Sequence, residues 1–234
     1  MTNSITIFPY QPFEIGSGLT LFNFQNKSEF SQLIFRLHNL KKHTTLTDDT
    51  NRILHFYTDP KNPFDENIKD VELLGDLNSF DINSATQLKI ILKKVVANST
   101  IIKDEIEGAN SELNNLVFEA ITQYTVPLSM DFYANFEKIL KAKGVFVDTS
   151  KWQNYCDKIM DVISFYSEFS SKKLLVFYGL ERLLSLDQLN EIDEYLKSVD
   201  LTIISLESYP MLLKEKGLNI KVYSIDNDHV RFDY

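Results

Sequence analysis

Lysine side chains gathered in one acid-free stretch are the clearest sign of chemistry in this sequence. Residues 82–103 contain no Asp or Glu but carry Lys89, Lys93, Lys94 and Lys103. Lys89 and Lys93 lie one helical turn apart and, with Lys94, fall outside the apolar stripe of the helix that this stretch predicts. Ammonium groups placed in this way bind phosphate oxygens. The alternative is an ordinary solvated helix face.

A second acid-free stretch covers residues 30–47 and adds Arg36, Lys41 and Lys42 as candidate phosphate contacts. The whole chain nevertheless carries a formal net charge of −9, which opposes nonspecific attraction to nucleic acid. Positive charge is therefore segregated rather than absent. One copy would neutralise few phosphates, but a symmetric ring with lysines around its hole would multiply the contacts.

Lys27 and Ser28 stand where a strand runs through a turn into a helix, the position of a phosphate-binding loop. The glycines of such a loop are missing, so the backbone cannot easily wrap N–H groups around a phosphate. Two readings stay open here: a divergent nucleotide hydrolase and an ordinary capped helix.

Acidic residues offer two further candidate sites. Glu181 and Arg182 follow a predicted buried strand at its carboxyl end, where α/β enzymes place their chemistry, although a surface ion pair has the same pattern. Asp104, Glu105 and Glu107 open a predicted helix and are potential oxygen ligands for a hard cation. Acids in a first helical turn are also what the helix dipole favours.

Histidine and cysteine give no metal or nucleophile pattern. His38, His43, His55 and His229 are scattered, and none has a second His or a Cys at metal-ligand spacing. Cys156 is the only cysteine, which excludes internal disulfides and zinc sites built from several thiolates. Its place in a predicted helix favours a buried, structural role.

A β-α-β unit over residues 172–206 organises the predicted fold. Residues 174–177 form an unbroken apolar run, typical of a strand covered on both faces. Ser185 and Asp187 then supply a helix cap and a first-turn acid, and residues 201–206 form the second strand. Such units close as parallel neighbours with a right-handed crossover, so the sequence predicts an α/β fold with a mainly parallel sheet.

The remaining periodicity predicts a helical appendage within this α/β domain. Pro127 divides a helical pattern over residues 101–143 into two helices, and a third long helix covers 150–171. We expect a head domain of residues 1–98 and 172–234 with a helical leg, 99–171, inserted in it. Within the head, the patterns predict strands at 4–8, 19–24 and inside 53–58, helices near 25–42 and 84–97, and two terminal strands at the tail.

Nothing in the composition points to a membrane. No apolar run approaches the length that crosses a bilayer, and the N-terminal residues lack the pattern of a secretory signal. We expect a soluble, cytoplasmic protein.

Four segments of this chain resemble, in order and spacing, the short form of the Csn-two family of type II-A CRISPR systems. The resemblance covers most of residues 70–207 and rests on several collinear matches, none of which is a catalytic signature. The segments are residues 73–94, 112–121, 139–148 and 170–207.

The resemblance implies an α/β head related to phosphate-loop folds, without a working phosphate loop, and a helical leg. It implies a nonenzymatic homotetrameric ring that encloses double-stranded DNA, binds its free ends without sequence preference and acts in acquisition of new spacers. It also implies no nucleotide cofactor, with lysines on the inner surface contacting phosphates. The guided nuclease and the integrase of the same system are expected partners. Besides the DNA-binding ring and the divergent nucleotide hydrolase, a third alternative is a scaffold that contacts these partners without any affinity for DNA.

Calcium is also implied by the resemblance, because short-form relatives carry several acids in the turn between their leg helices. The corresponding residues 123–131 of this chain keep only Asp131, with Glu119 upstream and Glu137 downstream. These three are the candidate metal ligands.

Overall fold

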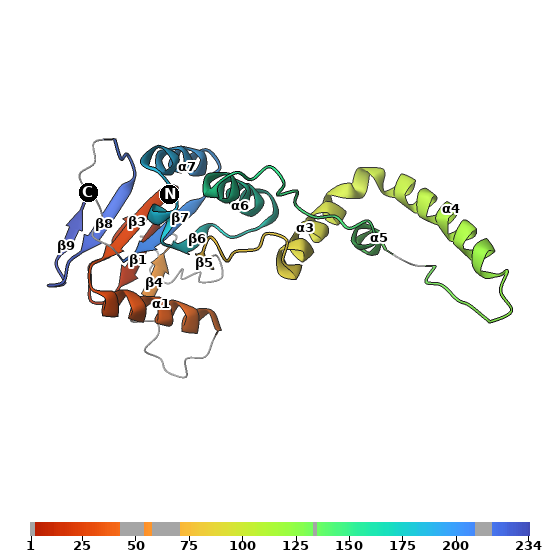
Figure 1. The fold of residues 1–234 in the computed structure, drawn as a ribbon, viewed down its shortest axis with the longest axis horizontal. Helices are drawn as coiled ribbons and strands as arrows, with labels where there is room; N and C mark the ends of the chain where they lie inside the picture. Colours follow the sequence, from red (N-terminus) through yellow and green to blue (C-terminus); the bar gives the residue numbers. More distant parts are fainter. Residues whose placement is uncertain (1–2, 43–53, 58–70, 133–134, 209–216) are drawn as a thin grey trace. The chain divides into compact units, whose positions relative to one another are not determined.

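A computed structural model describes residues 3–42, 54–57, 71–132, 135–208 and 217–234 of the protein (Figure 1). The chain forms two compact units, residues 1–80 with 149–234 and residues 81–148. These boundaries differ from the predicted 98/99 and 171/172. The helix at Ala85–Asn98 belongs to the second unit, and the helix at Tyr155–Phe169 belongs to the first.

The first unit is built on a six-stranded sheet whose order is β5-β6-β7-β3-β8-β9. Its first five strands run parallel, and only β9 is antiparallel, to β8. This confirms the predicted mainly parallel sheet and the two tail strands. The strands are β3 (Gly18–Phe24), β5 (Val71–Asp76), β6 (Leu174–Tyr178), β7 (Thr202–Glu207), β8 (Lys221–Ile225) and β9 (Arg231–Asp233).

The predicted β-α-β unit is present as β6, a 3-10 turn η3 (Leu180–Arg182), helix α7 (Leu186–Ser198) and β7. Ser185 caps α7 by accepting a hydrogen bond from the Gln188 N–H, and the Gln188 side-chain oxygen in turn accepts one from the Ser185 N–H. This reciprocal cap satisfies two backbone donors and explains why the helix begins at the predicted residue.

Two layers cover the sheet. Helices α6 (Tyr155–Phe169) and α7 lie side by side on one face, joined by a hydrogen bond between Ser164 and Tyr195, and α1 (Lys27–Lys42) lies on the other (Figure 1). A three-stranded antiparallel sheet, β2-β1-β4, packs with α1. Its strands are β1 (Asn3–Ile7), β2 (Phe13–Ile15) and β4 (Leu54–Tyr57). Two strands of the first unit were not predicted: β2, only three residues long, and β5 of the larger sheet.

The second unit is helical. It contains α3 (Ala85–Asn98), a 3-10 turn η2 (Ser99–Ile102), α4 (Lys103–Ile121) and α5 (Phe136–Ala142). The predicted break lies between α4 and α5, but α5 is shorter than expected. The Asn83 side chain holds the unit together by bonding both the N–H and the C=O of Val147, at 2.8 and 2.9 Å. None of the described helices is long and apolar enough to cross a membrane.

Gly18, at the start of β3, has a φ of +119°, and a Cβ atom there would overlap Asp193 Oδ1. Asp193 is buried and accepts hydrogen bonds from the Leu19 N–H at 2.8 Å and Lys197 Nζ at 2.5 Å. We therefore expect Gly18→Ala to displace this carboxylate and lower the free energy of unfolding by roughly 2–4 kcal/mol. Urea denaturation measures the change.

Gly16→Ala is the matched control, because nothing lies within 4 Å of a Cβ added at that position. It should change stability by no more than about 0.5 kcal/mol. Equal effects of the two substitutions would contradict this account of the β3 and α7 contact.

Candidate nucleic-acid interface

The three predicted lysines of α3 are exposed. Lys89, Lys93 and Lys94 face solvent, whereas Ile91 and Leu92 on the same helix are 6% and 4% exposed. Since burial of the apolar stripe determines which side of the helix faces inward, it also determines that the lysines face outward. A row of three ammonium groups is therefore available to a partner.

Helix α5 packs against α3 and extends this basic surface. Lys141 Nζ lies 2.6 Å from Glu137 Oε1. Its hydrogen bond lowers the pKa of the Glu137 carboxyl below its ordinary value, and the charges of Lys93 and Lys89 lower it further. Three lysines from two helices thus act on one carboxylate. We call Lys89, Lys93, Lys141 and Glu137 the α3–α5 basic surface.

Lys141 was not among the predicted phosphate contacts. The signal available for it is the spacing of lysines at 138, 141 and 143, directly after a single acid. Lys138 forms a separate ion pair, between its Nζ and Asp131 Oδ2 at 2.6 Å, and is not counted in this surface.

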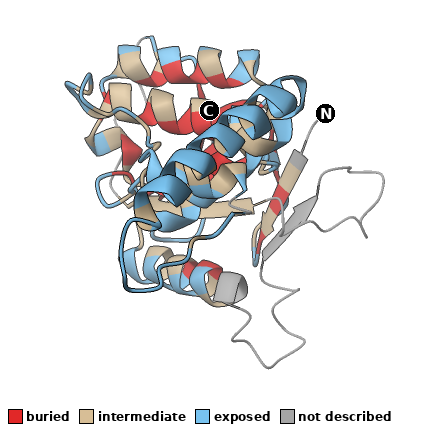
Figure 2. Cartoon of the chain, turned by 90° about the vertical axis from the view of Figure 1, so that its right-hand side faces the viewer, coloured by how far each residue is buried: buried red, intermediate tan, exposed pale blue. Residues whose placement is uncertain are grey.

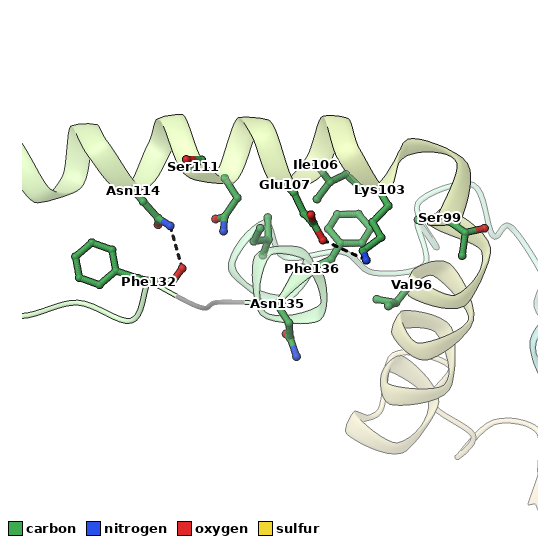
Figure 3. Close-up of a pocket in the computed structure, with 13 residues that line it drawn as sticks. Val96, Ser99, Lys103, Ile106, Glu107, Ser111, Asn114, Phe132, Asn135 and Phe136 are labelled. Carbon is green, nitrogen blue, oxygen red and sulfur yellow. Dashed lines mark hydrogen bonds and ion pairs between the residues drawn. The ribbon is translucent and has the colours of Figure 1, made fainter.

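Lys103, the fourth predicted lysine, lies apart from the α3 row at the start of α4. It forms an ion pair with Glu107 at 3.4 Å and lines a groove of about 560 Å³ between α4 and α5 (Figure 3). Apolar side chains of Ile106 and Phe136 also line this groove. The charge of Lys103 is therefore partly offset by its neighbour.

The other predicted basic residues belong to the first unit. Arg36 is half-buried on α1. Lys41 and Lys42 form the last turn of α1, but their side chains lie outside the described part of the structure. Within the second unit, the structure therefore brings Lys141 close to the lysines of α3, whereas Arg36 belongs to the other unit.

The three candidate calcium ligands do not form a site. Asp131 and Glu137 each bind a lysine ammonium at 2.6 Å, and the described residues contain no group of three or more His, Cys, Asp or Glu side chains placed to hold a metal. Calcium takes six to eight oxygen ligands. Glu119, Asp131 and Glu137 as placed do not fit it.

The expected phosphate-loop position is an ordinary helix cap. Asn26 Oδ1 accepts hydrogen bonds from the N–H groups of Ser28 and Glu29, at 3.0 and 3.3 Å. These are the free donors of the first turn of α1 that a phosphate would need. Of the two readings of Lys27 and Ser28, the geometry favours the capped helix.

Glu181 and Arg182 lie in η3 and are held by the end of β7. The Glu181 N–H donates to Glu207 Oε1 at 3.3 Å, and Arg182 Nη2 donates to Ser208 Oγ at 3.1 Å. Ser205 Oγ also donates to Glu207 Oε1, at 2.5 Å. Glu207 is 1% exposed, and this burial raises its pKa to about 7 despite those hydrogen bonds.

The family comparison decides the class of protein. A family model described as CRISPR-associated protein (Cas_Csn2) matches residues 49–229. The chain belongs to this family. The predicted family resemblance is thereby confirmed.

Two curated relatives carry the description CRISPR-associated protein Csn2. One, from Enterococcus faecalis, is 25% identical over 145 residues, which are 60% of this chain and 65% of the relative, slightly under two thirds of its length. The other, from Streptococcus agalactiae, is 23% identical over 218 residues, 91% of this chain and 90% of the relative.

A solved structure shares the fold of this Csn2-family chain. It is described as the crystal structure of Stu0660 of Streptococcus thermophilus, and it matches with a TM-score of 0.56 and 14% sequence identity. The match covers 96% of this chain and 74% of the other. At this identity the match bears on the fold, and it agrees with the predicted α/β class.

The buried Glu207 carboxyl gives the Csn2-family chain a pH-dependent stability. Because the folded-state pKa of about 7 lies above the ordinary 4.5, the folded state holds more protons between these values. The free energy of unfolding should therefore fall as pH rises from about 4.5 to 7, by up to roughly 3 kcal/mol. Glu207→Gln should remove this loss, which urea denaturation at pH 5 and pH 8 measures.

Glu194→Gln is the control, since Glu194 is an exposed acid on α7. It should keep the wild-type difference between the two pH values. A wild-type protein equally stable at both would refute the prediction for Glu207.

Proposed function

We propose that this Csn2-family protein is a nonenzymatic ring that binds the ends of double-stranded DNA without sequence preference during acquisition of new CRISPR spacers. The observation that carries the proposal is the exposed lysine row of α3, Lys89, Lys93 and Lys94, in an otherwise acidic chain. Lysine contacts to phosphate neutralise backbone charge and carry no base information, so binding through them is independent of sequence.

The small number of lysines in one α3 row indicates that several copies have to bind the same DNA. A single α3 row neutralises few phosphates, and the net charge of −9 repels a polyanion at long range. Four copies arranged around a duplex would bring four rows to the same DNA and leave the acidic surface outside. The ring is therefore the arrangement in which this charge pattern is compatible with binding.

The long helix α4 supports assembly of copies. It has 19 residues and no buried residue, and Figure 2 shows it almost wholly in the pale blue of exposed residues. Leu113, Leu116 and Val117, at positions i, i+3 and i+4 on one side of the helix, are 52%, 65% and 36% exposed. A helix of this kind gains most of its stability from burying its apolar side, and a second copy would supply the missing partner.

Calcium and nucleotide take no part in the proposal. Two of the three candidate metal ligands, Asp131 and Glu137, already bind lysines, and Asn26 occupies the donors that a nucleotide phosphate would use. The scaffold alternative, in which the protein contacts the guided nuclease and the integrase without binding DNA, is the outcome that a negative DNA-binding test would select.

Charge reversal on α3 tests the DNA contact. We expect Lys89→Glu, Lys93→Glu and Lys94→Glu together to abolish binding to linear duplex at about 150 mM salt, a loss of roughly a hundredfold or more, because three attractive charges per copy become repulsive. Gel shift with linear and closed circular duplex measures affinity and the preference for ends.

The matched control carries the same charge change on three exposed lysines outside α3: Lys27→Glu, Lys151→Glu and Lys173→Glu. It should retain most of the binding, and both variants should keep the wild-type mass in solution. The proposal would be contradicted if the wild-type protein bound neither linear nor closed circular duplex at low salt.

Disruption of α4 tests the assembly. Leu116→Glu should reduce the mass in solution from that of a tetramer, because a charge would be buried in the contact between copies. Light scattering after gel filtration, with calcium and with a chelator, measures the mass. Asn115→Glu on the same helix is the control and should leave the assembly intact; a wild-type monomer, or a tetramer seen only with calcium, would contradict the prediction.

A further inference from the structure

Glu137 is a carboxylate placed against the basic surface that the proposed function assigns to DNA. It belongs to α5, which packs on α3, and its side chain is 27% exposed, so it lies partly within the surface rather than extended into solvent. Its Oε1 accepts a hydrogen bond from Lys141 at 2.6 Å. Lys93 and Lys89 act on the same carboxyl by their charge.

A carboxylate in this position resembles a bound phosphate in its chemistry. Both present anionic oxygens to ammonium donors, and a distance of 2.6 Å is that of a charge-assisted hydrogen bond. The surrounding α3 stretch contains no acid of its own, so the anion comes from a different helix. While Lys141 is hydrogen-bonded to Glu137, part of its positive charge is neutralised and cannot attract DNA.

We propose that Glu137 is an internal counter-ion of the α3–α5 basic surface, bound to Lys141 where a DNA phosphate would otherwise bind, and that it sets the affinity and salt dependence of DNA binding. The inference rests on the proposed function and deepens it. When a duplex arrives, a backbone phosphate replaces Glu137 as the partner of Lys141, and the displaced carboxylate stays nearby and repels the DNA.

This assignment replaces the expected metal role of Glu137. A calcium ligand would stabilise the structure through the bound cation, so its loss would lower the stability of the protein and with it DNA binding. A counter-ion has the opposite signature, because removing its charge frees a lysine for DNA. The two roles therefore predict changes of opposite sign in DNA affinity.

The size of the effect follows from Coulomb's law. A unit charge about 6 Å from a phosphate in a water-like medium changes affinity by about threefold, and each subunit that contacts the duplex adds its own factor. Releasing one lysine per contacting subunit should also steepen the plot of log affinity against log salt by about 0.9 per subunit.

The experiment compares Glu137→Gln with Glu112→Gln in the full-length protein, using fluorescence anisotropy of a linear duplex at several salt concentrations. Glutamine keeps the size of the side chain and removes the charge. Glu112 is an exposed acid on α4 and supplies the same change in net charge elsewhere in the second unit. Urea denaturation of both variants shows that each is folded.

We expect Glu137→Gln to bind at least about threefold more tightly than the wild type, with a steeper salt dependence, and Glu112→Gln to match the wild type. In a Lys141→Gln background the gain from Glu137→Gln should shrink, because the lysine that is hydrogen-bonded to Glu137 is then absent and cannot be freed for DNA.

Three results overturn the inference. The first is a Glu137→Gln protein that binds no tighter than Glu112→Gln while the wild type binds DNA. The second is an undiminished gain in the Lys141→Gln background, which would make the effect a general one of net charge. A wild-type protein that does not bind linear duplex would instead remove the proposed function, and this inference with it.

Discussion

Burial of Ile91 and Leu92 is the constraint on which the lysine surface depends. Because these side chains leave water, α3 has one fixed rotation, and Lys89, Lys93 and Lys94 have to face outward. These three lysine side chains are thus positioned by apolar packing on the other side of their own helix. Helix α5, packed on α3, adds Lys141 and Glu137 to the same surface.

Elements with local signals were predictable from the sequence, whereas those defined by distant partners were not. The cap at Ser185 and the apolar run of β6 belong to a few adjacent residues, and both were predicted. Strand β2 exists only because it pairs with β1, and α6 belongs to the first unit because Ile159 and Ile163 are buried there. The apolar face of α6 is visible in the sequence, but not the unit that it packs against, so the boundary differs from the predicted one. Strand β2 is too short to show a sustained alternating apolar pattern and β5 has none, so both were missed.

The same division applies to the candidate site. The acid-free stretch identified the α3 lysines directly, because charge and spacing along one helix are visible in sequence. The roles of Glu137 and Glu207 depend on what faces them. Glu137 was expected to bind a metal and instead pairs with Lys141, and Glu207, inside an apolar strand, gave no sign that burial would shift its pKa.

The Asn26 side chain satisfies backbone N–H donors at the start of α1 without a ligand. In nucleotide-dependent proteins of similar topology, the first turn of this helix is completed by a phosphate, so the local structure follows the supply of ligand. Here the amide oxygen of one side chain supplies that completion within the chain itself. The first turn of α1 consequently has these backbone donors satisfied before any ligand arrives, and its folding does not have to wait for one.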